Sequence, residues 1–352
     1  MSTDEGRPPL DQRKAFILAT VVYEYIASGE PVGSQTLTQK YNLGVSSATV
    51  RNEMAELELG GYLVQPHTSA GRVPSDSGYR TYVDDLMQPE QLGEADRRRI
   101  RDELRDASRE LDEIVANATR VLGRLSNNLA FVTRPEIATP VMFKHLQLIW
   151  LSARTGVAIV VTSLGVAAQS LFELSADGAP DDFTRLSNAI NARFAAAPLG
   201  TIGEGEVGAV ARELGLSDDL RGVVVNALRN ARVQQEPTVA AAGAQNLLDQ
   251  PEFQDLKKLR SILRIVEEQK TLYDIVADAM NAGAPSVKIG HELGLDELND
   301  FSVVTVPYRF GKHATGMLSI LGPRRMPYGR LMALAAGTAE TLSERLSAVE
   351  IP

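Results

Sequence analysis

The stretch "SSATVRNEMAELELGGYLVQPHTSAGRVP", from Ser46 to Pro74, decides the expected fold of the first part of the chain. It begins with small hydroxyl residues, continues with apolar residues at helical spacing, and breaks at Gly60-Gly61. The runs "YLVQ" and "RVP" then flank the polar turn "PHTSAG", a pattern typical of a β-hairpin. We therefore predict a helix capped by Ser46 and followed at once by two short strands. The buried side of this helix is predicted to carry Val50, Met54 and Leu57.

Two helices are predicted upstream of this stretch. Leu10 to Ser28 has apolar residues three and four positions apart, and the turn "SGEPVGS" ends it. Ser34 is expected to cap a second, short helix, "SQTLTQKY", which ends near Asn42. Three helices with a tight turn between the second and third, followed by a two-stranded hairpin, are the layout of a winged helix-turn-helix.

The start of the third helix has the residue types of a DNA-reading surface. In this fold the N-terminal residues of that helix meet base edges while its apolar face holds the scaffold. Short polar side chains let the backbone enter the major groove closely, and Arg and Asn can bind guanine and adenine. From the helix we expect DNA contacts by Ser46, Ser47, Ala48, Thr49, Arg51 and Asn52. From the hairpin, which would touch backbone or minor groove, we expect them by His67, Thr68, Ser69 and Arg72.

A second interpretation of the same residues stays open. In it Ser46 only caps the helix, and Ser47 and Thr49 are solvated. The domain would then bind another protein, because winged helices also serve as protein-interaction modules.

The net charge of -9 weakens the DNA hypothesis, since affinity for the nucleic-acid backbone comes from Lys and Arg. Residues 46–52 and 60–75 nevertheless contain no acidic residue. The intervening Glu53, Glu56 and Glu58 lie on later turns of the helix. The charge of the whole chain therefore does not decide the question.

Length and composition indicate a cytoplasmic protein of two or three domains. The chain has 352 residues and no cysteine, which excludes disulfides and thiolate metal sites. No apolar run reaches the length of about 18 residues that a membrane span needs. The N-terminus lacks the apolar core of a signal peptide.

The rest of the chain is predicted to be mixed. Ser75 opens a helix, "SDSGYRTYVDDL", and Glu94 to Leu129 is predicted as one long amphipathic helix. Early strands are expected at "HLQLIWLS", "VAIVVTS" and "AQSLFEL", and late ones at "PSVKIGHEL", "FSVVTVPYR" and "HATGMLSILG". Asp182 to Gln254 is expected to be helical, and Arg330 to Ala348 is the final helix. We expect the early and late strands to complete a single antiparallel sheet that carries an inserted helical subdomain.

Enzymatic chemistry finds no support in the sequence. The histidines are His67, His145, His291 and His313, and they lie far apart, so a metal site is not expected. No nucleophile elbow or phosphate-binding loop is recognised either, and no cofactor is expected. Gly203, Gly205 and Gly208 spell a dinucleotide-binding motif. No β-rich run precedes it, however, and Glu204 and Glu206 would repel a pyrophosphate, so we interpret it as a loop. The run "RRRIR", Arg97 to Arg101, is interpreted as a solvated helix face rather than a phosphate contact.

The stretch "PVGSQTL…VSSATVRNEMAELELGGYLVQPHTSAGRVPSDSGYRTYVDDL" closely resembles the heat-inducible transcription repressor family HrcA. Its most specific part is "QPHTSAGRVPSDSGYR", Gln65 to Arg80. The resemblance continues through "NLLDQPEF" (Asn246 to Phe253), "VKIGHEL" (Val287 to Leu293) and "GPRRMPYGR" (Gly322 to Arg330). It covers nearly the whole chain and is weakest between Asp182 and Gln235.

The resemblance implies an α+β multidomain protein. An N-terminal winged helix-turn-helix is followed by a GAF-like antiparallel sheet domain, into which a helical dimerisation subdomain is inserted. We accordingly expect a winged-helix domain at 1–88, a linker helix region at 89–130, a GAF-like domain at 131–181 and 255–352, and an inserted dimerisation domain at 182–254.

The resemblance also implies a function. Family members are homodimers that bind double-stranded DNA at an inverted-repeat operator called CIRCE, and they repress groE- and dnaK-type chaperone operons. The GroE chaperonin assists them into the active form, and heat stress releases repression. The resemblance implies no enzymatic activity, no cofactor and no membrane partner. An alternative is a winged-helix regulator whose GAF-like domain senses a small ligand.

Overall fold

The computed structural model describes residues 10–68, 70–105, 111–137, 140–163, 165–233, 238–248, 250–253, 256–311 and 314–348. The chain divides into two compact units. The first comprises Met1–Arg134, Val239–Arg309 and Gly316–Leu346. The second comprises Pro135–Thr238 with the short segments Phe310–Thr315 and Ser347–Pro352.

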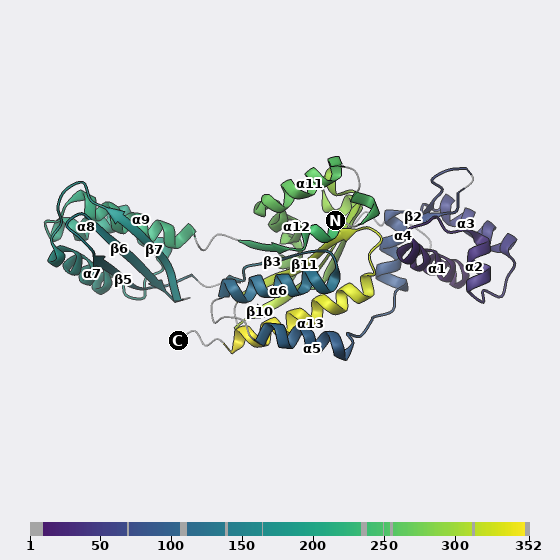
Figure 1. Ribbon diagram of the computed structural model, residues 1–352, viewed down its shortest axis with the longest axis horizontal. Coiled ribbons are helices and arrows are strands. Elements are labelled where there is room, and N and C mark those ends of the chain that lie inside the picture. The colour runs from purple at the N-terminus through teal and green to yellow at the C-terminus, as the bar shows by residue number, and fades with distance from the viewer. Residues whose placement is uncertain are drawn as a thin grey trace. The chain divides into compact units, whose positions relative to one another are not determined.

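The first unit begins with three helices and a hairpin, which we call the head (Figure 1). Its elements are α1 (Gln12–Ser28), α2 (Ser34–Lys40), α3 (Ser47–Leu59), β1 (Leu63–Val64) and β2 (Val73–Pro74). Apolar side chains from all three helices form its core: Ile17, Leu18, Val21, Val22, Leu37, Val50, Met54 and Leu57. The predicted order of elements is confirmed. Gly33, rather than Ser34, is the N-terminal cap of α2.

The predicted ends of α3 are confirmed. The Ser46 hydroxyl caps the helix by accepting a hydrogen bond from the Thr49 amide at 3.2 Å. Gly61, just past the helix, has φ 77°, a left-handed conformation that favours glycine. The chain thereby reverses into the antiparallel hairpin, in which Leu63 pairs with Pro74. The position of the wing-like hairpin beside α3 thus follows from the cap and the glycine.

After the head, α4 (Asp76–Thr81) continues into one π-helical turn (Tyr82–Leu86) and leads to a six-stranded sheet. The strand order is β8-β3-β11-β10-β9, and β4 pairs with β11. The strands are β3 (Leu129–Thr133), β4 (Glu136–Ile137), β8 (Val239–Ala242), β9 (Ser286–Ile289), β10 (Phe301–Phe310) and β11 (Ala314–Pro323). Of these, β3, β4 and β8 were not predicted, and β8 lies in a region predicted to be helical.

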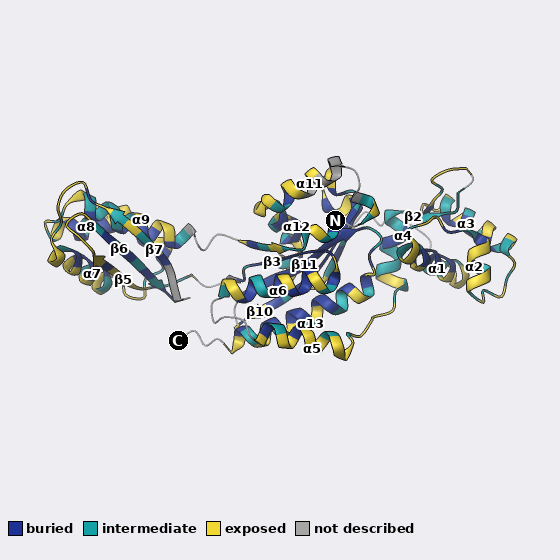
Figure 2. Cartoon of the chain, viewed as in Figure 1, coloured by how far each residue is buried: buried dark blue, intermediate teal, exposed yellow. Residues whose placement is uncertain are grey.

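Helices cover both faces of this sheet (Figure 1). They are α5 (Glu94–Arg105), α6 (Leu111–Ser126), α10 (Ala244–Leu248), α11 (Leu256–Glu267), α12 (Gln269–Ala282) and α13 (Tyr328–Ser347). Short 3-10 turns lie at η3 (Pro251–Phe253), η4 (Gly290–Leu293) and η5 (Asp296–Leu298). The central strands β10 and β11 are buried along nearly their whole length, as Figure 2 shows. The burial on both faces makes this sheet the core of the unit.

The prediction of one long helix from Glu94 to Leu129 is wrong. Two helices, α5 and α6, pack against each other, and the Asn117 side chain donates a hydrogen bond to the Glu103 carbonyl at 2.7 Å. On one straight helix, 14 residues would hold these groups about 21 Å apart. The periodicity of an apolar stripe shows which side of each helix is buried, but it does not show where the chain reverses. Residues 106–110, between the two helices in the sequence, lie outside the described ranges.

The second unit has a sheet of its own. Its strands are β5 (Phe143–Trp150), β6 (Thr155–Thr162) and β7 (Gly165–Glu173), in the order β5-β6-β7 and antiparallel. Its helices are α7 (Pro180–Phe194), α8 (Glu204–Glu213) and α9 (Asp218–Val233), with a 3-10 turn η2 (Leu199–Thr201). The Asn191 amide hydrogen-bonds the backbone of Leu146, at 2.7 and 2.9 Å, and thereby ties α7 to β5.

The prediction that early and late strands form a single sheet is therefore wrong. The prediction that the inserted subdomain is helical is also wrong, because this unit contains a three-stranded sheet. The neighbours of β10 are β9 and β11, and β11 pairs with β3. Each late strand thus already has its partners within the first unit, and no long edge is left for β5. The early strands instead bury one face against α7 and α9 in a separate core.

Candidate nucleic-acid interface

The first turns of α3 bring together the six residues predicted to read DNA. Ser46, Ala48, Arg51 and Asn52 are exposed, and Ser47 and Thr49 are partly exposed. Val50, between them, is fully buried and anchors the helix. The exposed N-terminal amides of a helix favour an anion such as a phosphate. This surface is therefore small, polar and free of acidic side chains.

Arg51 differs from the other basic residues of the head. Four of the five lysines and arginines between Gln12 and Pro74 form ion pairs with carboxylates. Those four are Arg13, Lys14, Lys40 and Arg72. Arg51 has no carboxylate partner among the described residues. Its exposed guanidinium is thus available to a ligand.

The glutamates of α3 are neutralised locally. Glu53 pairs with Arg13 at 3.5 Å and with Lys14 at 3.2 Å, both on α1. Hydrogen bonds to Asp11, Glu56 and Glu53 raise the pKa of Lys14, so its ammonium stays charged. These pairs leave the start of α3 with the positive charge of Arg51. A protein of net charge -9 can in this way present a surface that tolerates phosphate.

The hairpin turn presents two of its four predicted contacts. His67 and Thr68 are exposed, and the Gln65 side chain fixes the turn by donating hydrogen bonds to the carbonyls of Thr68 and Ala70, each at 3.0 Å. Ser69 lies outside the described residues.

Arg72 lies at the base of the hairpin, not at its tip. Its backbone exchanges two hydrogen bonds of 2.9 Å with Val32, and its guanidinium pairs with Glu58 at 2.9 Å. The side chain is only 17% exposed. The structure therefore gives Arg72 a structural contact that the sequence did not predict, because Val32 and Glu58 are distant in the chain.

Sequence reasoning missed two exposed residues at the start of α2, Gln35 and Thr36. The helix packs against α3, and Leu37 is its buried anchor. In helix-turn-helix proteins the first of the two helices crosses the DNA backbone. Once α2 and α3 are assigned, the polar residues beside Leu37 are the feature that identifies this second surface.

Other chemistry has little to support it in the described part of the chain. There, no group of three or more His, Asp or Glu side chains could hold a metal ion. The glycine motif begins at the cap of α8, after a 3-10 turn rather than a strand, and the Gly203 amide donates to Glu206 at 3.0 Å. On α5, Arg97, Arg98, Arg99 and Arg101 are exposed, as a solvated helix face requires. None of the described helices is long and apolar enough to cross a lipid bilayer.

A helical head with an uncharged polar helix start, an unpaired arginine and an adjacent hairpin is typical of DNA-binding transcription regulators. The family model "HrcA protein C terminal domain" matches residues 112–332. The chain belongs to the HrcA family.

Curated relatives are similar to this protein along nearly the whole chain. The heat-inducible transcription repressor HrcA of Brevibacillus brevis is 36% identical over 96% of this chain and 98% of its own length. That of Carboxydothermus hydrogenoformans is 36% identical over 97% and 98%, respectively. A crystal structure of a hypothetical protein, 24% identical, covers 97% of this chain and all of its own with a TM-score of 0.63, and supports the fold.

Proposed function

We propose that the head is a winged helix-turn-helix that binds double-stranded DNA, with α3 as the recognition helix and the hairpin as the wing. The observation that carries this proposal is the exposed Arg51, which has no carboxylate partner in the described part of the chain and lies within a cluster of small polar side chains. Arg51 would contact guanine or a phosphate, and Asn52 would contact adenine. Ser46, Ser47, Ala48 and Thr49 would contact phosphates or thymine methyl groups. His67, Thr68 and Ser69 would contact the DNA from the wing. Arg72 would support the wing from its base.

The regulator would repress heat-inducible chaperone operons by occupying the inverted-repeat operator CIRCE, and it would act in the cytoplasm. The names of the curated relatives and the resemblance of the sequence support this role. The six-stranded sheet would be the GAF-like domain. We place the winged-helix domain at 1–88 and the linker helices at 89–130. The sequence predicts the inserted dimerisation domain at 182–254. We propose instead the main segment of the second compact unit, Pro135–Thr238, because β5, β6 and β7 form a sheet of their own within it.

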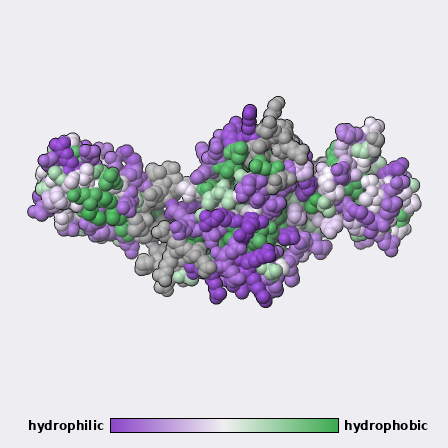
Figure 3. Space-filling model, viewed as in Figure 1, coloured by the Kyte–Doolittle hydropathy of each residue, from purple (hydrophilic) through white to green (hydrophobic). Residues whose placement is uncertain are grey.

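Dimerisation would use the open face of the sheet β5-β6-β7. Cross-strand neighbours Ile149, Val157 and Leu171 share this face, and Leu171 is 73% exposed. An apolar area is visible on this unit in Figure 3. Exposed apolar patches on folded proteins often mark interfaces. A second copy of the same sheet would cover it in a two-fold arrangement, because an inverted repeat requires two equivalent heads.

A substitution on this sheet face tests the dimer. Leu171→Glu should raise the dimer dissociation constant by at least about 100-fold, since a charge would be buried at the interface. Leu248→Glu, at an exposed leucine of α10, is the matched control. Sedimentation equilibrium measures both. An unchanged dissociation constant for Leu171→Glu would exclude this face.

The DNA-binding test is a gel shift with a CIRCE duplex. Arg51→Ala should weaken binding about 10-fold or more, because one base or phosphate contact of arginine is worth about 1–3 kcal/mol. As controls, the circular dichroism spectrum and the dimer dissociation constant of the variant must be the same as those of the parent protein. A correctly folded Arg51→Ala dimer that bound the duplex as tightly as the parent would show that the recognition surface is elsewhere.

Heat release and the GroE chaperonin enter this proposal through the family resemblance alone. Two routes are open: the regulator itself loses its active form on heating, or chaperonin becomes occupied by unfolded proteins. Operator occupancy measured against temperature, with and without purified chaperonin, distinguishes them. If added chaperonin leaves the curve unchanged, the second route is excluded.

A further inference from the structure

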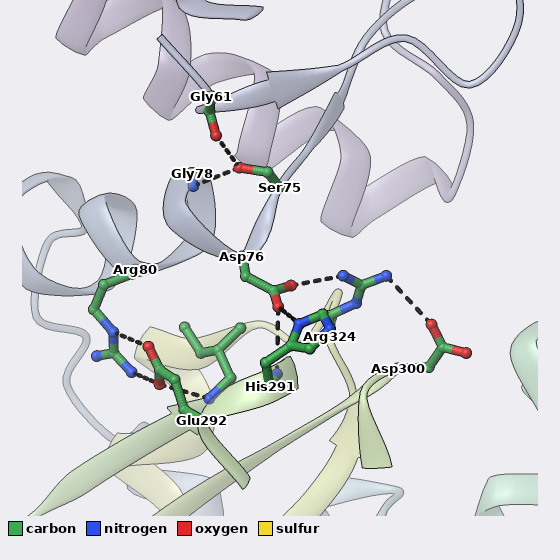
Figure 4. Close-up of polar contacts among 10 residues, drawn as sticks. Gly61, Ser75, Asp76, Gly78, Arg80, His291, Glu292, Asp300 and Arg324 are labelled. Atoms are coloured by element: carbon green, nitrogen blue, oxygen red, sulfur yellow. Dashed lines mark hydrogen bonds and ion pairs between the residues drawn. The ribbon is translucent and has the colours of Figure 1, made fainter. Parts of the chain in front are cut away.

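Four stretches that carry the family resemblance meet at one place in the first unit. They are the start of α4, the 3-10 turn η4 after β9, the turn between β11 and α13, and η3. None of these residues belongs to the proposed DNA surface. Figure 4 shows that side chains of α4 point toward the loops of the six-stranded sheet. The head is tied to α4 by Ser75, whose hydroxyl donates a hydrogen bond to the Gly61 carbonyl at 2.6 Å (Figure 4). We therefore call the contacts between α4 and the sheet region the head–sheet contact. It is formed by Asp76, Arg80, His291, Glu292 and Arg324.

Asp76, the first residue of α4, is the centre of the contact. Its Oδ1 accepts a hydrogen bond from Arg324 Nη1 at 2.6 Å (Figure 4). Its Oδ2 lies 2.6 Å from His291 Nδ1 and accepts a longer bond from the His291 amide. Arg324 is held in turn by Asp300 at 3.3 Å. Burial alone would raise the pKa of Asp76, but the bonds from His291 and Arg324 hold it below its usual value.

Arg80 provides a second, independent link one turn further along α4. Its Nε donates to Glu292 at 2.9 Å, and its Nη2 donates to the Val287 carbonyl at 2.6 Å and to Glu292. Nη1 is occupied by Asp84 on the same helical segment. Glu292 also accepts a bond from the Ile289 amide at 2.9 Å. One guanidinium thus joins the helix to both the backbone and a side chain of the sheet region.

The fit at this contact is close. Gly290 has φ +54°, and a β-carbon at that position would overlap the Asp76 carboxylate. Tyr79, 1% exposed, packs edge-on against Tyr328 of α13 with 6.0 Å between ring centroids. Arg325 pairs with Glu252 and approaches Gly29 at the end of α1. Polar and aromatic contacts therefore fix α4 from several sides.

The chemistry of the contact indicates that it fixes the orientation of α4 against the sheet more than it adds to the stability of the fold. The head and the sheet each have an apolar core of their own. Ion pairs between partly buried groups add little net stability, because desolvation offsets much of the Coulombic gain. They do, however, require one particular orientation of their partners, since bidentate and charge-assisted hydrogen bonds are directional.

Orientation matters for a dimer on an inverted repeat. Once one head has bound its half-site, the second head binds the other half-site with an effective concentration that depends on how close the dimer holds it to that site. If α4 could change its orientation against the sheet, the head would turn with it, and much of that advantage would be lost. We propose that the head–sheet contact sets the orientation of the head so that both heads of a dimer reach their half-sites, and that Asp76 and Arg324 are positioning residues for operator binding. This rests on the proposed function.

The DNA test compares two duplexes, the full CIRCE repeat and a single half-site from it. Asp76→Asn removes the charge and keeps the size of the side chain. We expect it to weaken binding to the full repeat at least about 10-fold and to leave half-site binding unchanged. Glu297→Gln, which breaks the exposed ion pair with Arg264 within the same unit, is the matched control. Equal loss on both duplexes, or no loss on either, overturns the positioning role.

The outcome also separates this inference from the one on which it rests. If the parent protein binds neither duplex, the proposed function fails, and the positioning role fails with it. If the parent binds both duplexes and Asp76→Asn binds each of them as tightly as the parent does, only the positioning role fails.

A second measurement needs no DNA. Because the chain has no cysteine, spin labels can be placed at Gln39→Cys on α2 and Glu340→Cys on α13, both exposed positions. In dimers diluted with an excess of unlabelled chain, the parent should give a single narrow distribution of the distance between the two labels of one subunit, and Asp76→Asn should broaden it. A merely structural role would change the melting temperature without this broadening. Identical distributions in parent and variant, or a broad one in the parent, would contradict the inference.

Discussion

Arg324 Nη1 lies 2.6 Å from Asp76 Oδ1, although 248 residues separate the two in the sequence. The contact joins the helix that leaves the head to the turn that follows the last strand of the six-stranded sheet. Its two residues lie in different family-specific stretches, and no local pattern connects them. The close fit around this pair leads to the first prediction.

Gly290→Ala should weaken the head–sheet contact without removing any charged group. The new methyl group would meet the Asp76 carboxylate, and the positive φ adds backbone strain of about 1 kcal/mol. Gly294→Ala is the matched control, because Gly294 also has positive φ (+73°) but has open space around it. We expect a loss of unfolding free energy larger by about 1–3 kcal/mol for Gly290→Ala, measured by urea denaturation. Equal losses would show that strain alone accounts for the effect.

The salt dependence of operator binding should show whether Arg51 contacts a phosphate or a base. The logarithm of operator affinity falls linearly with the logarithm of salt concentration, by about 0.9 per neutralised phosphate. If Arg51 contacts a phosphate, Arg51→Ala should reduce the slope by about 1 for each recognition helix that engages DNA. Arg13→Ala, which removes an arginine already paired with Glu53, should leave the slope unchanged. Fluorescence anisotropy from low to high salt measures both. An unaltered slope with weakened binding would instead assign Arg51 to a base contact.

Glu24 should make the head sensitive to acid. Its buried carboxylate accepts hydrogen bonds from Lys40 Nζ and the Tyr41 hydroxyl, each at 2.6 Å, and these lower its pKa from 4.5. A lowered pKa in the folded state gives stability that is present above the unfolded value and lost as the pH falls through the folded value. Glu24→Gln should therefore lower the melting temperature at pH 7 and have a smaller effect near pH 3. The partner Tyr41 has a pKa raised to about 12 by burial and by Glu24, so it stays neutral throughout.

Glu30→Gln, at an exposed glutamate of the same segment, is the control for that comparison. Thermal unfolding followed by circular dichroism at both pH values measures all three proteins. A difference between Glu24→Gln and the parent that did not shrink on acidification would contradict the assignment.

Tyr308→Phe should destabilise the six-stranded sheet by about 1–3 kcal/mol, because it leaves a buried carbonyl without its partner. The Tyr308 hydroxyl donates to the Thr133 carbonyl at 2.7 Å, and the side chain is 1% exposed. Tyr23→Phe, at a tyrosine that is 59% exposed, should have little effect. Guanidinium denaturation compares the two variants. Equal stabilities would mean that the Thr133 carbonyl finds another partner.

Local patterns in the sequence predicted the head well. The spacing of Val50, Met54 and Leu57, the cap at Ser46 and the left-handed Gly61 are determined by residues within one or two helical turns of one another. The same holds for the hairpin of β5 and β6 and for the final helix α13. The candidate DNA residues on α3 were also identifiable, because exposure on a short helix follows from the position of its buried face. Arg72 was not, since its partners Val32 and Glu58 come from other elements.

The sequence by itself determined the family, the order of local elements and the residues at the start of α3. Only the tertiary structure decided that the helical stretch after the head is two helices, with Asn117 of α6 against Glu103 of α5. It also decided that the early strands form their own sheet and that Asp76 meets Arg324. The physical reason is the range of the interactions. Helix caps, turns and periodic burial depend on neighbours in the chain. Strand partners and ion pairs between distant segments depend on which edges and cavities the rest of the chain leaves unfilled.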